Sequence, residues 1–395
     1  MEMAGRGFSG SYRFGYQGSE KDNEVSGDGN SYTTEFRQLD PRLGRWFSVD
    51  PVFQPWQSPY TSMDNNPIGK TDRLGNVAGD IKTIEINGTA YEREELAEDP
   101  MNGEGYKDDM KTGETTTGKV GHKDGNTYSF SYDEKTKKYT YYKLTPNDKK
   151  TNALKAISEF EKNPNTTTVF TNIPKQEIVK ELKARVLSGG EEIYQSTNTC
   201  GIAAVAKVFA SADPEGYVKF TLDLYQTGTA THNDYQINID ENVKDWANKT
   251  TTVGNMKGAD LILIGSLRYV ENTPNAFDNS ASSGYTTPAE ISKLLEKLVG
   301  LQTAGGDYFT TTSDFQSADK QVKEGSLYVI MLHTGWLKGG VGSPWHYTVY
   351  QGNSSYSNEE STFNYSKWYY GATKKTSASI TRFNASLFDV WFYKK

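Results

Sequence analysis

The C-terminal half of this chain of 395 residues changes from helical to strand patterns, and this order limits its fold class. Apolar periodicity predicts four helices, at 200–210, 214–225, 259–268 and 288–299. Strand patterns follow and predict five strands, at 326–333, 345–350, 366–370, 379–382 and 388–394. Helices followed by an antiparallel sheet are typical of the α+β class. We therefore expect an α+β domain over residues 191–395.

The first 76 residues differ from the rest of the chain in amino-acid composition and in hydrophobic periodicity. They are dense in Gly, Asp, Asn, Pro and aromatic residues and show almost no helical periodicity, which favours short strands and tight turns. A segment with so few aliphatic residues cannot bury a core alone. We therefore expect residues 1–76 to form a short β-rich segment that completes a larger β structure.

Residues 77–190 are expected to be a linker or adaptor region, or else part of the fold of the C-terminal domain, with hairpins first and helices after them. An Asn-Gly turn at 87–88 between alternating residues predicts a β-hairpin. Helix start and stop signals, among them the Gly189-Gly190 pair, predict helices near the end of the region. The predicted elements are a hairpin at 82–89, paired strands at 128–132 and 139–142, a loop or linker at 99–126, and helices at 150–162 and 174–187.

Composition and charge exclude several classes of function. The formal net charge of −7 argues against a nucleic-acid partner, because nucleic-acid-binding domains gather excess Lys and Arg. One cysteine cannot form an internal disulfide. No apolar run is long enough to cross a membrane, so stable membrane insertion is not expected. Residues 1–10 lack a signal-peptide pattern, so secretion would use another route or a larger chain.

That single cysteine, Cys200, follows a polar stretch and precedes the small apolar run 203–210. This pattern predicts a thiol in the first turn of a buried helix, where the helix dipole lowers the thiol pKa. Far downstream, His346 lies in a predicted strand. A cysteine at a helix start and a histidine on a distant strand are the minimum set for thiol nucleophilic catalysis.

The order of these residues resembles the papain-like cysteine peptidases. The separation of Cys200 and His346 falls within the roughly 130–150 residues typical of papain-type enzymes. The run Gln-x4-Cys-Gly-x-Ala-Ala, from Gln195, also resembles the bacteriocin-leader peptidases. The resemblance implies that Cys200 is the nucleophile, His346 the base and Gln195 an oxyanion donor, and that Asn364 orients the imidazole. Alternatives for the orienting residue are Gln351, Asn353 and Asp389.

Inert interpretations of the same residues stay open. A lone cysteine before an apolar helix is often a core residue, and His346 could be a hydrogen-bonded sheet residue. The strand context of His333 favours a structural role near the site, and His122 and His232 lie in polar loops. No HExxH, paired-His or CxxC spacing occurs, so neither a metal nor another cofactor is expected.

The N-terminal segment resembles the core domain that ends Rhs and YD-repeat proteins. The resemblance covers roughly residues 12–76 and is carried by the segments 12–24, 39–51, 58–60 and 65–68. It implies a β shell that encloses a variable C-terminal toxin, which is freed by self-cleavage at a Pro-x4-Asp-Pro-x-Gly motif. Pro67, Asp72 and Gly75 match that motif, and Arg73 stands in place of its second proline.

Taken together, the two resemblances predict the toxin module of an Rhs-type polymorphic toxin that hydrolyses an amide bond in a protein or peptide of a target cell. Deamidation of glutamine or its crosslinking to an amine would use the same site. The expected partners are the substrate and a cognate immunity protein, and delivery would use a contact-dependent secretion system. The alternatives are a non-catalytic toxin that binds a target or disturbs a membrane, and an inactive Rhs fragment.

Overall fold

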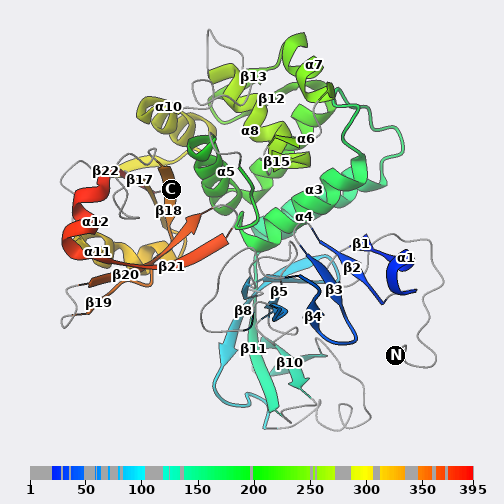
Figure 1. Cartoon of the computed structure of the whole chain (residues 1–395), viewed down its shortest axis with the longest axis vertical. Coiled ribbons are helices and arrows are strands. Elements are labelled where there is room, and N and C mark those ends of the chain that lie inside the picture. The colour runs from blue at the N-terminus through cyan, green and yellow to red at the C-terminus, as the bar shows by residue number, and fades with distance from the viewer. Residues whose placement is uncertain are drawn as a thin grey trace. The chain divides into compact units, whose positions relative to one another are not determined.

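A computed structural model of the chain divides it into two compact units, Met1–Ile84 with Tyr91–Pro146, and Glu85–Ala90 with Asn147–Lys395 (Figure 1). The structure describes residues 20–27, 30–34, 37–48, 58, 60–63, 70–71, 79–80, 83–102, 119–123, 125–133, 138–195, 199–249, 252–253, 256–271, 286–305, 312–333, 346–357, 362–369 and 372–394.

The first unit contains a small antiparallel sheet in the order β1-β2-β3-β4. Its buried core consists, among the described residues, of Leu39, Trp46 and Met63, with the Arg37 guanidinium 4.7 Å above the Trp46 ring. So small a core fits the low aliphatic content of the segment. The bounds are β1 Glu20–Lys21, α1 Asn23–Ser26, β2 Tyr32–Thr33, β3 Gln38–Asp40, β4 Arg45–Trp46 and a separate pair, β5 Lys70–Thr71 with β6 Gly79–Asp80.

A five-stranded sheet in the order β7-β8-β11-β10-β9 follows. Asn87 and Gly88 both have positive φ, 51° and 81°, which confirms the predicted Asn-Gly hairpin turn. The paired strands predicted at 128–132 and 139–142 are also confirmed, whereas β9 is a strand within the segment predicted to be loop or linker. The bounds are β7 Thr83–Ile86, β8 Thr89–Leu96, β9 Lys119–Lys123, β10 Asn126–Asp133 and β11 Lys138–Pro146.

The second unit begins with helices whose ends follow their sequence signals. Asn147 caps α3 by accepting the Lys150 N–H, and Asp213 caps α6 in the same way with Gly216. The glycine at the end of α4, Gly189, has φ 61°, a left-handed conformation that favours glycine. The bounds are α3 Asp148–Lys162, α4 Lys175–Ser188, α5 Cys200–Ala212, α6 Pro214–Thr227, α7 Glu241–Lys249, α8 Gly258–Glu271, α10 Pro288–Lys293 and a π-helical turn η3 Leu294–Leu298.

These helices share one hydrophobic core. Leu182 of α4, Ile202 of α5 and Ile262 of α8 are fully buried in it. Helices α3 and α4, expected in the linker region 77–190, therefore pack with the helices of the C-terminal unit. Two short hairpins accompany them, β12 Thr229–His232 with β13 Tyr235–Asn238, and β14 Thr252–Val253 with β15 Met256–Lys257.

A buried ionic cluster joins α4 to the start of α8. Asp260 pairs with Arg185 at 2.6 Å, and Glu181 accepts the Ala259 N–H at 2.6 Å. Gly258 has φ +49°, and a Cβ there would come within 2.1 Å of the Glu181 carboxylate, so this helix start requires glycine. Burial raises the pKa of Glu181 to about 7, with a further contribution from Asp260 that Arg185 opposes.

The remaining strands form a seven-stranded sheet in the order β16-β22-β17-β18-β20-β19, with β21 paired to β20. Alternate residues of β17 serve two cores: Ile330 and Leu332 face the helical core, while Val329 and Met331 pack with Phe315 of α11. The sheet therefore lies between the helical layer and α11 with α12 (Figure 1). The bounds are β16 Gln302–Gly305, α11 Thr312–Lys323, β17 Leu327–His333, β18 His346–Tyr350, β19 Ser355–Ser357, β20 Thr362–Tyr369, β21 Ala372–Ser379, α12 Ile380–Ser386 and β22 Leu387–Lys394.

The architecture confirms the predicted α+β class at this coarse level, with helices ahead of an antiparallel sheet. The strand predicted at 379–382 is wrong, because Ser379 accepts the Arg382 N–H at 3.2 Å and starts α12. Helices α7 and α11 were not predicted. In the parts of the chain that the structure describes, we find no helix with the length and apolar content to cross a membrane.

Candidate functional site

The candidate site is centred on Cys200, the first residue of α5. Thr199 precedes the helix, but its hydroxyl lies 3.5 Å from the Met256 sulfur and does not cap the helix start. The first backbone N–H groups of a helix have no partner inside the helix. Here the N–H groups of Cys200 and Gly201 lie near the half-buried thiol and favour its charged form.

Strand β18 supplies a third backbone donor to the same sulfur. The N–H of Tyr347, the residue after His346, hydrogen-bonds the Cys200 thiol. Burial raises the pKa of this thiol above its ordinary value, and the three N–H groups oppose that shift. The predicted lowering of the pKa is therefore wrong in its net direction, because the loss of hydration raises the thiol pKa by more than the N–H groups at the helix start lower it.

The register of the sheet also places the imidazole of His346. His346 is directly opposite His333, and such pairs have their side chains on one face of the sheet. The His333 ring lies 6.3 Å from that of Phe383 in α12, so the pair lies on the α11–α12 face. Cys200 packs against the helical core on the other face. The thiol and the imidazole thus approach the first residues of β18 from opposite sides.

His333 is buried, with 4% of its surface exposed. Burial, together with the charges of Lys367 and His346, holds the pKa of His333 well below its ordinary value, so this ring is neutral. Neither ring nitrogen has a hydrogen-bond partner in the described parts of the chain. These features agree with the predicted structural role near the site.

Gln195, the predicted oxyanion donor, has 1% of its surface exposed. Neither its amide oxygen nor its amide nitrogen finds a hydrogen-bond partner among the residues that the structure describes. Buried polar groups of native proteins are nearly always satisfied, so an unsatisfied amide points to a ligand or water as its partner.

The register does not bring Asn364 to His346. Val349 pairs with Trp368, and from this pair Asn364 lies four residues away along β20 while His346 lies three residues away along β18 in the other direction, seven residues in all. Asn364 itself pairs with Ser355 of β19. At about 3.3 Å per residue this separation is about 23 Å, which exceeds hydrogen-bond reach. Asn364 therefore does not orient the imidazole in this structure. The pairing of the strands, and not the spacing in the sequence, decides where Asn364 lies along the sheet.

The three alternatives for the orienting residue differ in their position. The Gln351 N–H bonds the Ser366 carbonyl, and the Asn353 amide bonds the Ser366 hydroxyl, so both lie beyond the far end of β18. Asp389 pairs with Leu332, which in turn pairs with Tyr347. Of the candidates, Asp389 is therefore the one whose backbone is level with the His346 end of the sheet.

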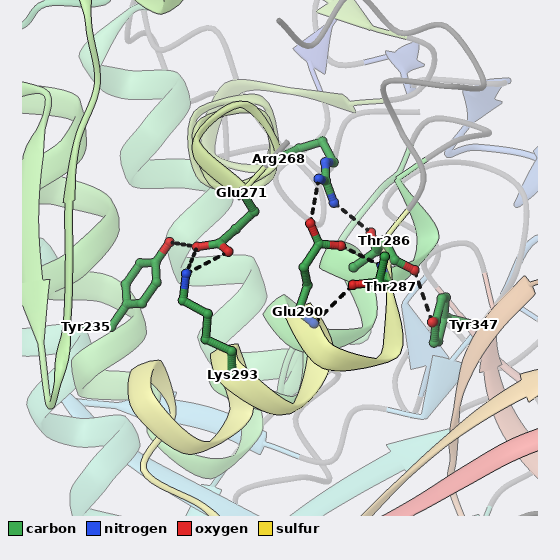
Figure 2. Close-up of polar contacts among 8 residues, drawn as sticks. All are labelled: Tyr235, Arg268, Glu271, Thr286, Thr287, Glu290, Lys293 and Tyr347. Carbon is green, nitrogen blue, oxygen red and sulfur yellow. Dashed lines mark hydrogen bonds and ion pairs between the residues drawn. The ribbon is translucent and has the colours of Figure 1, made fainter. Parts of the chain in front are cut away.

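A polar network that the sequence did not reveal lies beside the thiol (Figure 2). Thr286 accepts a hydrogen bond from Arg268 at its hydroxyl and another from the Tyr347 hydroxyl at its carbonyl. A Cβ on Gly201 would lie 2.5 Å from the Thr286 Cβ, so α5 approaches Thr286 as closely as a glycine permits. Two sequence signals could have indicated this contact, the Cys-Gly pair and the Thr-Pro-x-Glu helix start at 287–290.

Three further predictions concern the self-cleavage motif, the histidines outside the site and a metal site. Pro67, Asp72 and Gly75 of the predicted self-cleavage motif lie outside the described residues. The loop positions predicted for His122 and His232 are wrong, because His122 lies in β9 and His232 ends β12, where its Nε2 lies 3.0 Å from the Asp213 carboxylate. Over the described ranges, no group of three or more His, Cys, Asp or Glu side chains is arranged to hold a metal ion.

Comparison of the chain with family models, with curated proteins and with solved structures finds no match.

Proposed function

We propose that the C-terminal unit is a cysteine-dependent amide hydrolase of papain-like type, with Cys200 as its nucleophile. The observation that carries the proposal is the hydrogen bond from the Tyr347 N–H to the thiol. It brings Cys200 to the residue next to His346, although the two are far apart in sequence. The unsatisfied, buried amide of Gln195 adds a second donor in the same unit.

In the proposed reaction the Cys200 sulfur attacks the carbonyl carbon of an amide, and His346 accepts the thiol proton. The N–H of Cys200 and the amide of Gln195 stabilise the oxyanion that forms. His346 returns its proton to the leaving amine, and a thioester remains on the enzyme. Water then attacks the thioester and releases the acid, while attack by another amine would give a crosslinked product. The register places the His346 ring on the opposite face of the sheet from Cys200, so this proton transfer requires the start of β18 to turn the ring toward the sulfur.

We propose further that this unit is the toxin of an Rhs-type polymorphic toxin. This part of the proposal rests on the resemblance of residues 12–76 to the Rhs core domain. The substrate is then a protein or peptide of a competing cell, the partner is an immunity protein, and a contact-dependent secretion system delivers the chain. The net charge of −7 suits protein partners better than nucleic acid.

The test is inducible expression of the full chain in a bacterial host. We expect the wild type to stop growth, and Cys200→Ala and His346→Ala to be folded but harmless. His122→Ala is the matched control, because His122 is exposed and bonds only the Thr127 hydroxyl in the described structure. Growth arrest by Cys200→Ala would refute the catalytic proposal and favour a toxin that acts by binding. A harmless wild type would favour an inactive fragment.

A further inference from the structure

Thr286 connects three elements of the candidate site although it is not one of the predicted site residues. It has 2% of its surface exposed and lies just before α10. Its carbonyl accepts the Tyr347 hydroxyl at 3.1 Å, and its hydroxyl accepts from Arg268 of α8 at 3.2 Å. Its side chain also touches Gly201 of α5. Two of these contacts are made to the residues that directly follow His346 and Cys200.

An ion pair holds Thr286 in this place (Figure 2). Arg268 has 1% of its surface exposed, and its second guanidinium nitrogen bonds the Glu290 carboxylate at 3.0 Å. Glu290 also accepts the Thr287 N–H, so one carboxylate anchors both the guanidinium and the backbone next to Thr286. A buried guanidinium is tolerated only when its charge is paired, and its planar fork fixes the direction of both bonds.

We propose, on the basis of the proposed function, that Thr286 is a positioning residue that keeps the Tyr347 N–H against the Cys200 sulfur. Tyr347 is held at both ends, since its hydroxyl bonds Thr286 and its N–H bonds the thiol. The N–H favours the thiolate only while β18 stays within hydrogen-bond distance of α5. Arg268 and Glu290 act through Thr286 and have no direct part in the reaction.

A second network in the same region provides a matched control. The Tyr235 hydroxyl donates to Glu271 at 2.6 Å, and Lys293 bonds the same carboxylate (Figure 2). It resembles the first network in its elements, because Glu271 lies in α8 and Lys293 in α10. Among the described residues, none of its bonds reaches Thr286, Gly201 or Cys200. Tyr235→Phe and Tyr347→Phe therefore each remove one buried tyrosine hydroxyl, and only the second removes a bond to Thr286.

The experiment measures the rate of alkylation of the full chain by iodoacetamide from about pH 6 to about pH 10. Cys200 is the only cysteine in the sequence, so the mass increase reports on this thiol alone. We expect Tyr347→Phe to shift the profile to higher pH and to lower the rate near neutral pH about three- to tenfold, the loss expected for one hydrogen bond. Tyr235→Phe should stay within about twofold of wild type, and both variants should unfold at similar urea concentrations.

A second pair of variants tests Thr286 itself. Thr286→Val removes the hydroxyl that Arg268 binds and should shift the profile as Tyr347→Phe does, whereas Thr286→Ser keeps that oxygen and should restore the wild-type profile. A reactive wild-type thiol with an unchanged Tyr347→Phe profile would overturn this inference alone, as would equal losses in Tyr347→Phe and Tyr235→Phe. A wild-type thiol that resists alkylation over the whole range would overturn the proposed function as well.

Discussion

Gly201→Ala tests the close approach of α5 to Thr286. The added Cβ would lie 2.5 Å from the Thr286 Cβ, 2.8 Å from its hydroxyl oxygen and 3.0 Å from its methyl group. An ordinary contact begins near 3.4 Å, so Thr286 or α5 must move by about 1 Å. Rotation of the Thr286 side chain cannot relieve the clash, because its Cβ is fixed to the backbone.

The magnitude follows from two opposing effects. Overpacking a buried contact costs about 1–3 kcal/mol, and this clash with a Cβ belongs in the upper part of that range. Alanine is a better helix former than glycine by about 1 kcal/mol, which offsets part of the cost. We therefore expect Gly201→Ala to lower the free energy of unfolding by about 1–2 kcal/mol.

The assay is urea unfolding of four proteins, namely wild type, Gly201→Ala, Thr286→Gly and the double variant. This cycle separates the clash from the other effects of each substitution. The double variant should be more stable than the sum of the single effects predicts, by about 2 kcal/mol. A Gly201→Ala protein as stable as wild type, with no coupling to Thr286→Gly, would refute the described contact.

Two further outcomes are expected. Burial raises the pKa of Glu181 to about 7, above the 4.5 of an ordinary glutamate, so the folded state prefers the protonated side chain. The free energy of unfolding should therefore fall by about 3 kcal/mol as pH rises from about 4.5 to about 7. Glu181→Gln should remove this decrease in urea titrations at several pH values, and an unchanged slope would contradict the cause given. Asn364→Ala should leave the alkylation profile of Cys200 within about twofold of wild type, because Asn364 is about 23 Å along the sheet from His346. A tenfold loss would show that the two residues meet.

Local sequence signals predicted most of the helices of the second unit. Asn147 and Asp213 are N-caps, and Gly189 ends α4, so each boundary depends on residues within one turn of it. The failure at 379–382 has a local cause too. Ser379 starts a helix by capping it, although Ile380 and Thr381 favour strands by intrinsic propensity.

In the candidate site too, the features that depend on neighbouring residues could be predicted and those that depend on distant residues could not. A helix that begins at Cys200 follows from the neighbouring residues, and so does a strand at His346. The level of Asn364 depends on how β20 pairs with β18, and no residue near Asn364 encodes that register. The net pKa of Cys200 could not be predicted either, because burial by distant elements decides its sign.

Strand β22 is the last of the seven strands in sequence, yet it lies between β16 and β17. A ribosome releases the chain from its N-terminus, so the helices around Ile202 can collapse while β17 still lacks this neighbour. Until residues 387–394 emerge, β17 has an open edge between two apolar faces, a state prone to pairing with other nascent chains. The sheet is therefore complete only after β22 has inserted between β16 and β17, strands that precede it in the sequence.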